Sequence, residues 1–300
     1  MKKPLLLVLL TLFLVPPSLA SARSDNANAA YDRKDIAALT MMAKAGDPAA
    51  QHYLGFMFGE GEGVREDYTE ALKWFRKAAN QGYDVAQYSL GVMYQSGQGV
   101  AEDDAVAVSW YRKAADQGYA DAQVELGGRY SEGRGVAQDY AAAASWYRKA
   151  ADQGVAIAET ILGGMYYHGK GVTQDYAAAV SWCHKAAERG DAQAQFSLGA
   201  MYDFGIWKEF GCVNKDYTAA ASWYRKAADQ GDANAQVRLG EMYRDGLGVT
   251  QDYVQAHKWY NLSAVSGDEE NKKNRDNLAA KMTSVQIAEA QRLASAWVKK

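Results

Sequence analysis

The pattern of hydrophobic and polar positions repeats along most of this chain with a nearly constant period. Glycines recur at positions 46, 82, 118, 154, 190, 231 and 267, so that five intervals are 36 residues long and one is 41. A period of this length is typical of an array of supersecondary units that pack on one another. The units cover about 47–82, 83–118, 119–154, 155–190, 191–231 and 232–267.

Each unit contains two stretches with the hydrophobic spacing of an α-helix. Ala86, Leu90 and Tyr94 lie four residues apart and predict the first helix of the second unit. The second helix is predicted to begin after an aspartate, whose carboxylate can accept hydrogen bonds from the free N–H groups of the first turn. The buried stripe predicted for this helix in the third unit is Tyr140, Ala143, Trp146 and Ala150. A glycine at the far end stops the helix, so each unit is predicted to be a helix hairpin.

Two further sets of glycines have predicted structural roles. A glycine follows the central leucine of each first helix, as Gly91 follows Leu90. It costs about 1 kcal/mol relative to alanine, so we expect a neighbouring helix to pass too close for a Cβ. A glycine pair, such as Gly61 and Gly63, joins the two helices, and the residue between the pair differs in charge among the units. That variation excludes a shared calcium or phosphate site and predicts a turn with positive φ.

The first 22 residues have the features of a secretory signal peptide. Lys2 and Lys3 precede an apolar run over 5–15, and Ala20-Ser21-Ala22 has the form of a cleavage site. The run is shorter than the roughly 20 apolar residues that span a bilayer, and no later stretch qualifies. A periplasmic or secreted chain that begins at Arg23 and has no membrane span is therefore expected.

The regions on either side of the array have their own predicted structures. Residues 23–31 are expected to be a flexible N-terminus, 32–46 a half repeat with only a second helix, and 268–300 a pair of capping helices. Thr283 and Gln286 predict a capping box at the start of the last helix. The apolar stripe of that helix, which would cover the last hairpin, is Ile287, Ala290, Leu293 and Trp297.

Charge and residue spacing exclude several kinds of ligand. Removal of the signal peptide takes away two of the 33 Lys and Arg residues and leaves 31 against 36 Asp and Glu. Nucleic acid is therefore not expected as a partner, because its recognition depends on clustered positive charge. The histidines at positions 52, 168, 184 and 257 and the two cysteines show no helical pair at ligand spacing, so no metal and no cofactor is expected.

One sequence pattern recurs over residues 32–267. It reads A-x-x-x-L-G-x-M-Y-x-x-G-x-G-V-x-x-D-Y-x-x-A-x-x-W-Y-x-K-A-A-x-x-G and resembles the Sel-one-like repeat, a relative of the tetratricopeptide repeat. The resemblance implies an all-α fold, an α/α solenoid of stacked helix hairpins that forms a right-handed superhelix with a concave face. Two features depart from the pattern: Asp104 stands where other units have tyrosine, and the fifth unit has five extra residues.

The resemblance also implies a function. It favours an exported scaffold that mediates protein–protein interaction with an envelope or host protein through the concave face. Some proteins with such repeats have been labelled penicillin-binding or β-lactamase-like, but the Ser-x-x-Lys sequence of the serine enzymes does not occur here. No catalytic residue is visible, so an enzyme is not expected.

A carbohydrate or peptidoglycan-fragment binder stays open as the alternative, because a tryptophan recurs in every unit. Its identical position in each unit favours packing within the hairpin over an aromatic ligand site. The Arg-Lys pairs that follow, such as Arg112-Lys113, are expected to be solvated. The tryptophans are Trp74, Trp110, Trp146, Trp182, Trp223 and Trp259.

The resemblance to tetratricopeptide repeats implies that the first helices line the concave groove. Residues two before, two after and five after the leucine would then face the groove, and they vary between units. The candidate binding residues are His52, Phe56, Tyr88, Val92, Gln95, Thr160, Tyr167, Phe196, Asp203, Glu241 and Arg244.

The fifth unit and the one before it carry two more predictions. The inserted loop adds Ile206, Trp207 and Phe210 where other units are polar, and an exposed apolar cluster indicates a contact with a partner. The same residues could instead pack on the neighbouring helices. Cys183 and Cys212 lie in adjacent units, so a disulfide between them is possible in an oxidising compartment, as are two free thiols.

Overall fold

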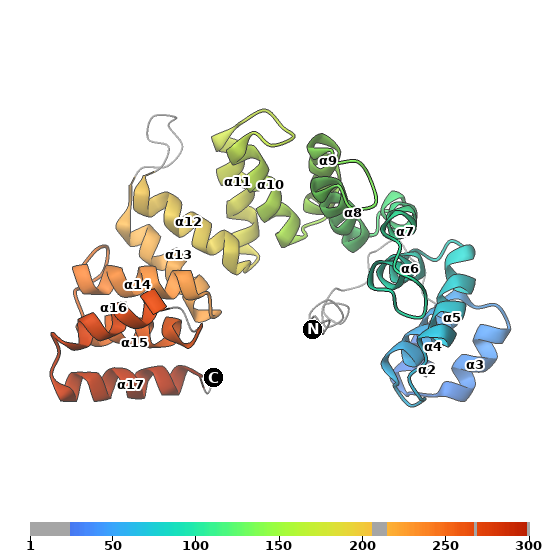
Figure 1. Ribbon diagram of the computed structural model, residues 1–300, viewed down its shortest axis with the longest axis horizontal. Coiled ribbons are helices and arrows are strands. Elements are labelled where there is room, and N and C mark those ends of the chain that lie inside the picture. Colours follow the sequence, from blue (N-terminus) through green and yellow to red (C-terminus); the bar gives the residue numbers. More distant parts are fainter. Residues whose placement is uncertain (1–24, 206–214, 267–268, 299–300) are drawn as a thin grey trace. The chain divides into compact units, whose positions relative to one another are not determined.

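The computed structural model describes residues 25–205, 215–266 and 269–298. These ranges form sixteen α-helices and one 3₁₀ helix and contain no strand. The chain divides between residues 153 and 154 into two compact units. Within each unit, the helices pack in hairpins that follow one another in sequence order (Figure 1). The expected all-α solenoid of stacked hairpins is confirmed.

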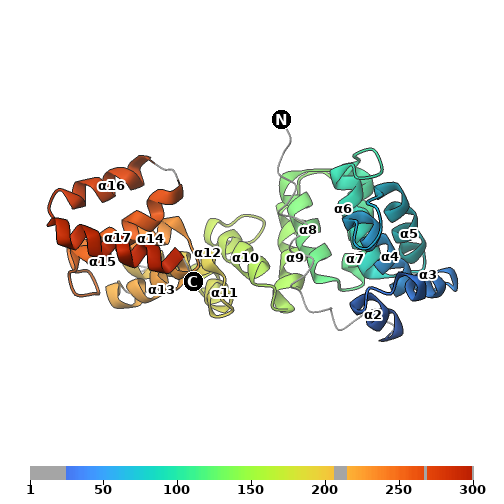
Figure 2. The same cartoon turned by 90° about the horizontal axis from the view of Figure 1, so that it is seen from below.

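Unit 1 contains three full hairpins and two preceding helices (Figure 2). The N-terminal pair is α2 (Asp25–Asp32) and α3 (Ile36–Lys44). The hairpins are α4 (Pro48–Glu60) with α5 (Tyr68–Asn80), α6 (Asp84–Ser96) with α7 (Asp104–Asp116), and α8 (Ala120–Glu132) with α9 (Tyr140–Asp152).

Unit 2 also contains three hairpins, followed by the C-terminal helices. The hairpins are α10 (Ala156–His168) with α11 (Tyr176–Glu188), α12 (Ala192–Phe204) with α13 (Tyr217–Asp229), and α14 (Ala233–Asp245) with α15 (Tyr253–Ser263). The 3₁₀ helix η3 (Ala264–Ser266) leads to α16 (Glu269–Ala279) and α17 (Ser284–Val298).

The predicted helix ends are confirmed. Each second helix begins after an aspartate whose carboxylate accepts from backbone N–H groups, as Asp139 does from Ala141 and Ala142 at 2.9 Å. Gly61 and Gly63 turn the chain between α4 and α5 with φ of 67° and 73°. Gly59, two residues earlier, lies inside α4 with helical geometry.

In five of the six hairpins the glycine after the leucine packs against an aromatic ring of the second helix, and in the fourth it packs against Cys183. A Cβ on Gly91 would lie 2.5 Å from Cδ1 of Tyr111, which confirms the expected close approach. The ring belongs to the residue after the tryptophan, so the predicted stripe of α9 is partly wrong. Tyr147 is 5 % exposed, whereas Trp146 is only half-buried. Tyrosine takes the inner position because the neighbouring glycine leaves room for its ring.

The tryptophans and the Arg-Lys pairs are involved in local contacts. The lysine three residues after each of the first five tryptophans lies over its ring, at 3.7–4.0 Å from the ring centroid. The arginine of the pair reaches the next hairpin, where Arg76 Nη2 donates to the Tyr94 hydroxyl at 2.8 Å. Arg112 and Arg225 bond Tyr130 and Tyr243 in the same way. These arginines are exposed, as expected, and they also connect neighbouring hairpins.

A buried glutamine in the first helices connects successive hairpins. Gln87 Nε2 donates to the Ala79 carbonyl at 3.2 Å, and Gln87 Oε1 accepts from Gln117 Nε2 at 2.8 Å. Gln51, Gln123 and Gln195 make the same pair of bonds. Because both ends of the buried amide are satisfied, this side chain fixes the spacing of neighbouring hairpins.

The two ends of the array differ in how well they were predicted. The prediction of a flexible segment over 23–31 is wrong from residue 25 onward, because α2 forms there and Ala27 and Ala30 are buried. The half repeat expected over 32–46 therefore has a preceding helix. At the other end the capping box is confirmed, with Thr283 N donating to Gln286 Oε1 at 2.9 Å, and α17 packs on α15.

No described helix combines the length and hydrophobicity that a membrane span requires. Residues 1–22, for which a signal peptide is expected, lie outside the described residues.

Candidate functional site

The candidate groove residues differ in how accessible they are. His52, Tyr88 and Val92 are buried, at 7–8 % exposure. Tyr88 packs against Tyr111 of α7 and against Tyr119, which precedes α8, with ring centroids 5.6 and 5.2 Å apart. These residues contribute mainly to packing between hairpins. The half-buried candidates are Phe56, Gln95, Thr160, Tyr167, Phe196, Asp203, Glu241 and Arg244.

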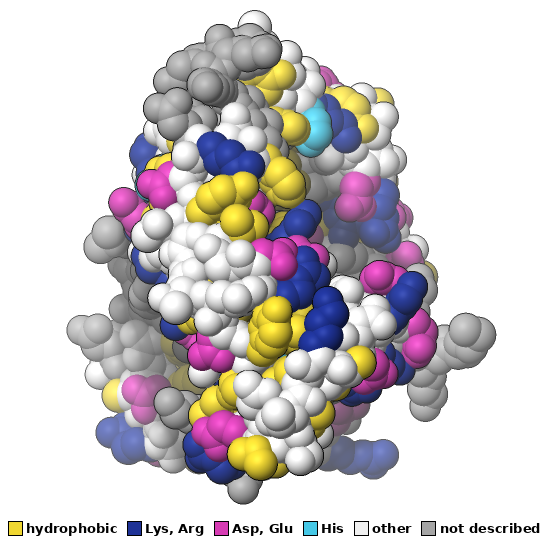
Figure 3. All heavy atoms as spheres, turned by 90° about the vertical axis from the view of Figure 1, so that its left-hand side faces the viewer, with side chains coloured by type: hydrophobic (Ala, Val, Ile, Leu, Met, Phe, Trp, Pro, Cys, Tyr) yellow, Lys and Arg dark blue, Asp and Glu magenta, His cyan; other side chains and the backbone are white. Residues whose placement is uncertain are grey.

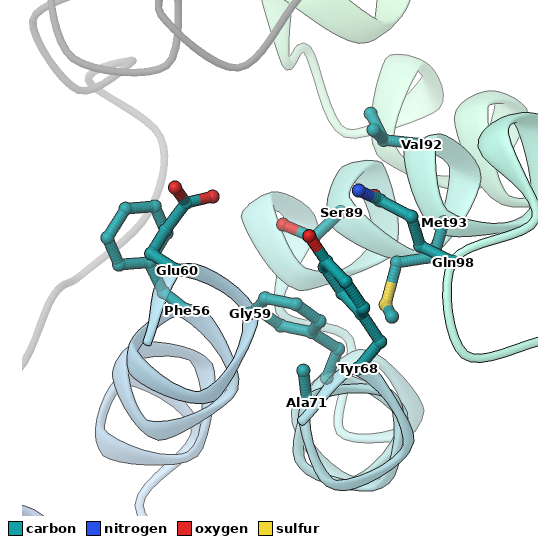
Figure 4. A pocket seen from close by; sticks show the side chains of 10 residues that line it. Phe56, Gly59, Glu60, Tyr68, Ala71, Ser89, Val92, Met93 and Gln98 are labelled. Atoms are coloured by element: carbon teal, nitrogen blue, oxygen red, sulfur yellow. The ribbon is translucent and has the colours of Figure 1, made fainter. Parts of the chain in front are cut away.

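Phe56 and Val92 line the same pocket in unit 1, between α4, α5 and α6 (Figure 4). The cavity has a volume of about 40 Å³. Figure 4 shows the polar ends of Glu60, Tyr68 and Gln98 on the side away from Ala71. The full lining is Phe56, Gly59, Glu60, Tyr68, Ala71, Phe75, Ser89, Val92, Met93 and Gln98.

Two differences between the first and second hairpins explain this pocket. In the second hairpin the Tyr111 hydroxyl of α7 donates to the Gln95 side chain of α6, so the two groups meet between these helices. In the first hairpin, Gly59 stands at the position of Gln95 and Phe75 at the position of Tyr111. The amide side chain and the hydroxyl are therefore both missing, and the pocket occupies their place.

The pocket has a carboxylate without a partner at its edge. Among the described residues, no cation or hydrogen-bond donor pairs with Glu60. Burial, followed by the carboxylates of Glu66 and Glu62, raises the pKa of Glu60. A carboxylate in this setting is stabilised by a nearby positive charge.

A second pocket, in unit 2, brings together Asp203, Glu241 and Arg244. Its volume is about 340 Å³, and Tyr217 and Phe204 line it together with charged side chains. Glu241 accepts from Arg238 at 3.0 Å, and Arg244 bonds Asp245 at 2.6 Å. These charges are therefore already paired within the protein.

The remaining candidates in unit 2 do not line either of the pockets described above. Thr160 Oγ1 donates to the Ala156 carbonyl at 3.0 Å and lies 3.0 Å from Asp191 Oδ1. Tyr167 packs on Tyr176 and Phe196 on Tyr224, each with ring centroids 5.7 Å apart. These side chains have structural contacts that account for their positions.

Asp104, which departs from the repeat pattern, forms an ion pair that was not predicted from the sequence. Arg129 Nη1 lies 2.6 Å from Asp104 Oδ1, and its side chain is only 4 % exposed. Arg129 stands where the other units have methionine, as Asp104 stands where they have tyrosine. Tyr68 and Met93 occupy the same two positions one hairpin earlier and line the first pocket. A comparison of both positions across the repeats would have revealed the ion pair.

Cys183 is free in the structure and buried, at 4 % exposure. Its Sγ occupies the place of the tyrosine ring, 2.8 Å from a Cβ built on Gly163. Cys212, the other cysteine of the possible disulfide, lies outside the described residues, so both the bridge and the two free thiols stay open. The loop residues Ile206, Trp207 and Phe210 lie outside them as well.

We expect the Cys183 thiol to resist alkylation in the native protein. Burial raises its pKa to about 11, so little thiolate is present at neutral pH. Iodoacetamide followed by intact-mass measurement should modify Cys183 only after unfolding, without any need for a reductant. A protein that is labelled at this residue only after reduction would instead contain the disulfide.

Neither the face seen in Figure 3 nor the described clusters of His, Cys, Asp and Glu indicates a metal site. Figure 3 shows basic, acidic and hydrophobic side chains intermixed on one face. Within the described ranges, no three His, Cys, Asp or Glu side chains lie close enough to share a metal ion.

Comparison with known proteins identifies the repeats. A Sel1 repeat protein from Oxalobacter formigenes is 37 % identical, with a TM-score of 0.70, over 80 % of this chain and 98 % of that chain. A protective antigen present in uropathogenic Escherichia coli strains, which displays an SLR fold, is 30 % identical, with a TM-score of 0.50, over 91 % of this chain and 82 % of that one. No curated protein matches the sequence.

The family comparison gives the boundaries of the repeats. Sel1 repeats match residues 48–83, 84–119, 120–155, 156–191, 192–232 and 233–268, one residue later than the expected units. Each match begins at or next to the start of a first helix and includes one complete hairpin of the structure. The chain therefore belongs to the Sel1 repeat family.

Proposed function

We propose that this chain is an exported scaffold that binds a protein or peptide partner through the face built by its first helices. Sel1 repeat proteins are generally non-catalytic scaffolds and commonly mediate protein–protein interactions. The similarity to a protective antigen supports an exported location, as do the signal-peptide features of residues 1–22. The partner belongs to the cell envelope or to a host.

The observation that carries this proposal is the division of each hairpin into constant and variable positions. The capping aspartates, the glycine contacts and the glutamine bonds recur from one hairpin to the next. Positions beside them on the first helices differ, and in unit 1 one such position, Gly59, lines a pocket together with Phe75 of the second helix. A rigid frame with variable side chains on one face is how repeat arrays acquire selective binding.

The aromatic side chains give less support to the carbohydrate alternative. A sugar ring would need an open tryptophan face, but a lysine Nζ lies over each of Trp74, Trp110 and Trp146 in unit 1. The same contact occurs at Trp182 and Trp223 in unit 2.

The proposal predicts that substitutions on the two faces of a hairpin affect binding differently. The chain without residues 1–22 would be immobilised, partners captured from envelope and host extracts, and the affinity of each measured by interferometry. Phe56→Ala or Glu241→Ala should lower the affinity for the captured partner by about tenfold, because anchor side chains carry most of the binding energy. Lys73→Ala, on the exposed side of α5, serves as the control.

Two results would contradict this function. One is retention of the chain on purified sacculi with no protein captured, which favours the carbohydrate alternative. The other is equal affinity for the Phe56, Glu241 and Lys73 variants, which would place the binding surface elsewhere.

A further inference from the structure

The pocket of unit 1 combines an apolar lining with an acidic edge. Phe56, Phe75 and Met93 supply the apolar surface, and Tyr68 adds a third aromatic ring. Glu60 stands at the edge without an ion-pair partner among the described residues. A volume of about 40 Å³ exceeds the 10–15 Å³ or so that a single water requires, so the end of a side chain fits.

The charge of the chain is distributed unevenly between the units. Residues 25–153 contain 19 Asp and Glu against 13 Lys and Arg, whereas residues 154–300 contain 17 of each. The negative charge of the exported chain is thus concentrated in the unit that contains the pocket. Glu60, Glu62 and Glu66 all lie within one short segment beside it. An acidic surface attracts basic partners and accelerates their association.

We infer that the pocket between α4, α5 and α6 receives an arginine or lysine side chain from a basic segment of the partner protein. The inference rests on the proposed function, because it names the chemistry of the partner at one point of the binding face. The methylene groups of such a side chain would pack against Phe56, Phe75 and Met93. Its cationic end would meet the Glu60 carboxylate and the face of an aromatic ring.

A cation accounts for the pocket better than a purely apolar side chain does. An aliphatic group would fill the apolar part of the pocket but would gain nothing from the Glu60 carboxylate, which is exposed at its edge. An arginine or lysine fills the same volume with methylene groups and supplies the missing partner. The neighbouring carboxylates of Glu62 and Glu66, which disfavour the ionised form of Glu60, would favour the bound cation.

Occupation of the pocket can be followed by the methyl signal of Met93. The exported chain would be labelled with [methyl-¹³C]methionine, and the signal assigned by Met93→Leu. The probes are three amidated tripeptides, with arginine, citrulline or norleucine between two glycines. We expect the arginine peptide to shift the Met93 signal and to bind about tenfold more tightly than citrulline, which has the same shape without the charge.

Three variants distinguish binding in the pocket from general attraction to an acidic surface. Gly59→Gln restores the side chain found in the next hairpin and should abolish the shift, and Glu60→Gln should weaken binding by about tenfold. Glu132→Gln removes the same charge from another hairpin of unit 1 and should leave binding within about twofold.

Several outcomes would overturn the inference. They are equal binding of the arginine and citrulline peptides, an unchanged Met93 signal up to about 10 mM arginine peptide, and equal effects of Glu60→Gln and Glu132→Gln. If one occurs while captured partners still depend on Phe56 or Glu241, only the inference fails. If no partner is captured at all, the proposed function fails, whatever the tripeptides do.

Discussion

We expect Asp104→Ala to lower the free energy of unfolding of unit 1 by about 3 kcal/mol. The substitution leaves the Arg129 guanidinium without the carboxylate that lies 2.6 Å away, in a place where its side chain is 4 % exposed. A buried charge without a partner costs more than the pair itself contributed. Arg134 Nε lies 3.6 Å from the same carboxylate, but the side chain of Arg134 is half exposed. The loss of this contact should therefore cost little stability.

A double variant provides the matched test. Asp104→Tyr with Arg129→Met recreates the tyrosine and methionine that stand at these positions one hairpin earlier, as Tyr68 and Met93. Replacement of a buried ion pair by packed apolar groups is often neutral or stabilising. We therefore expect the double variant to equal or exceed the stability of the natural protein.

Urea unfolding followed by circular dichroism would measure both variants. The expected order of midpoints is double variant, natural protein, then Asp104→Ala. An Asp104→Ala midpoint equal to that of the natural protein would show that Arg129 reaches water at no cost. A double variant as unstable as the single one would show that the ion pair is needed for packing.

Much of the fold could be predicted from the sequence because each hairpin repeats the same local signals. The aspartates at the helix starts and the glycine pairs such as Gly61 and Gly63 act within a few residues, and both were placed correctly. The choice between Trp146 and Tyr147 was wrong, since adjacent residues differ by only about 100° around a helix. Which of the two faces inward depends on Gly127, in the preceding helix.

The candidate site was less predictable, because the pocket exists where side-chain groups present in the next hairpin are absent. The spacing rule selected Phe56 and Val92, which share the pocket. Its third position in this unit is Gly59, which was not among the candidates, and Phe75 on the second helix lies outside the rule. The same rule selected Tyr88, which is buried between helices. A motif search finds residues that are present, whereas a cavity follows from the volume left by several residues at once.

Replacement by alanine at two glycines of unit 1 should change the stability in opposite directions. Gly91→Ala would place a Cβ 2.5 Å from the buried ring of Tyr111, which can move only by disturbing the packing between α6 and α7. Overpacking of this kind costs about 1–3 kcal/mol, partly offset by the helix propensity of alanine. We therefore expect a net loss of about 1–2 kcal/mol in the free energy of unfolding.

Gly59→Ala is the matched control in the preceding hairpin. Its Cβ would meet only the Cβ of Ala71, at 3.8 Å, which is an ordinary contact, and its φ is not positive. Alanine should therefore stabilise unit 1 by up to about 1 kcal/mol through helix propensity alone. Thermal and urea unfolding of both variants would decide. If Gly91→Ala also raised the stability, the close approach of Tyr111 would not be the reason for glycine at that position, and its role would have to lie in binding rather than in packing.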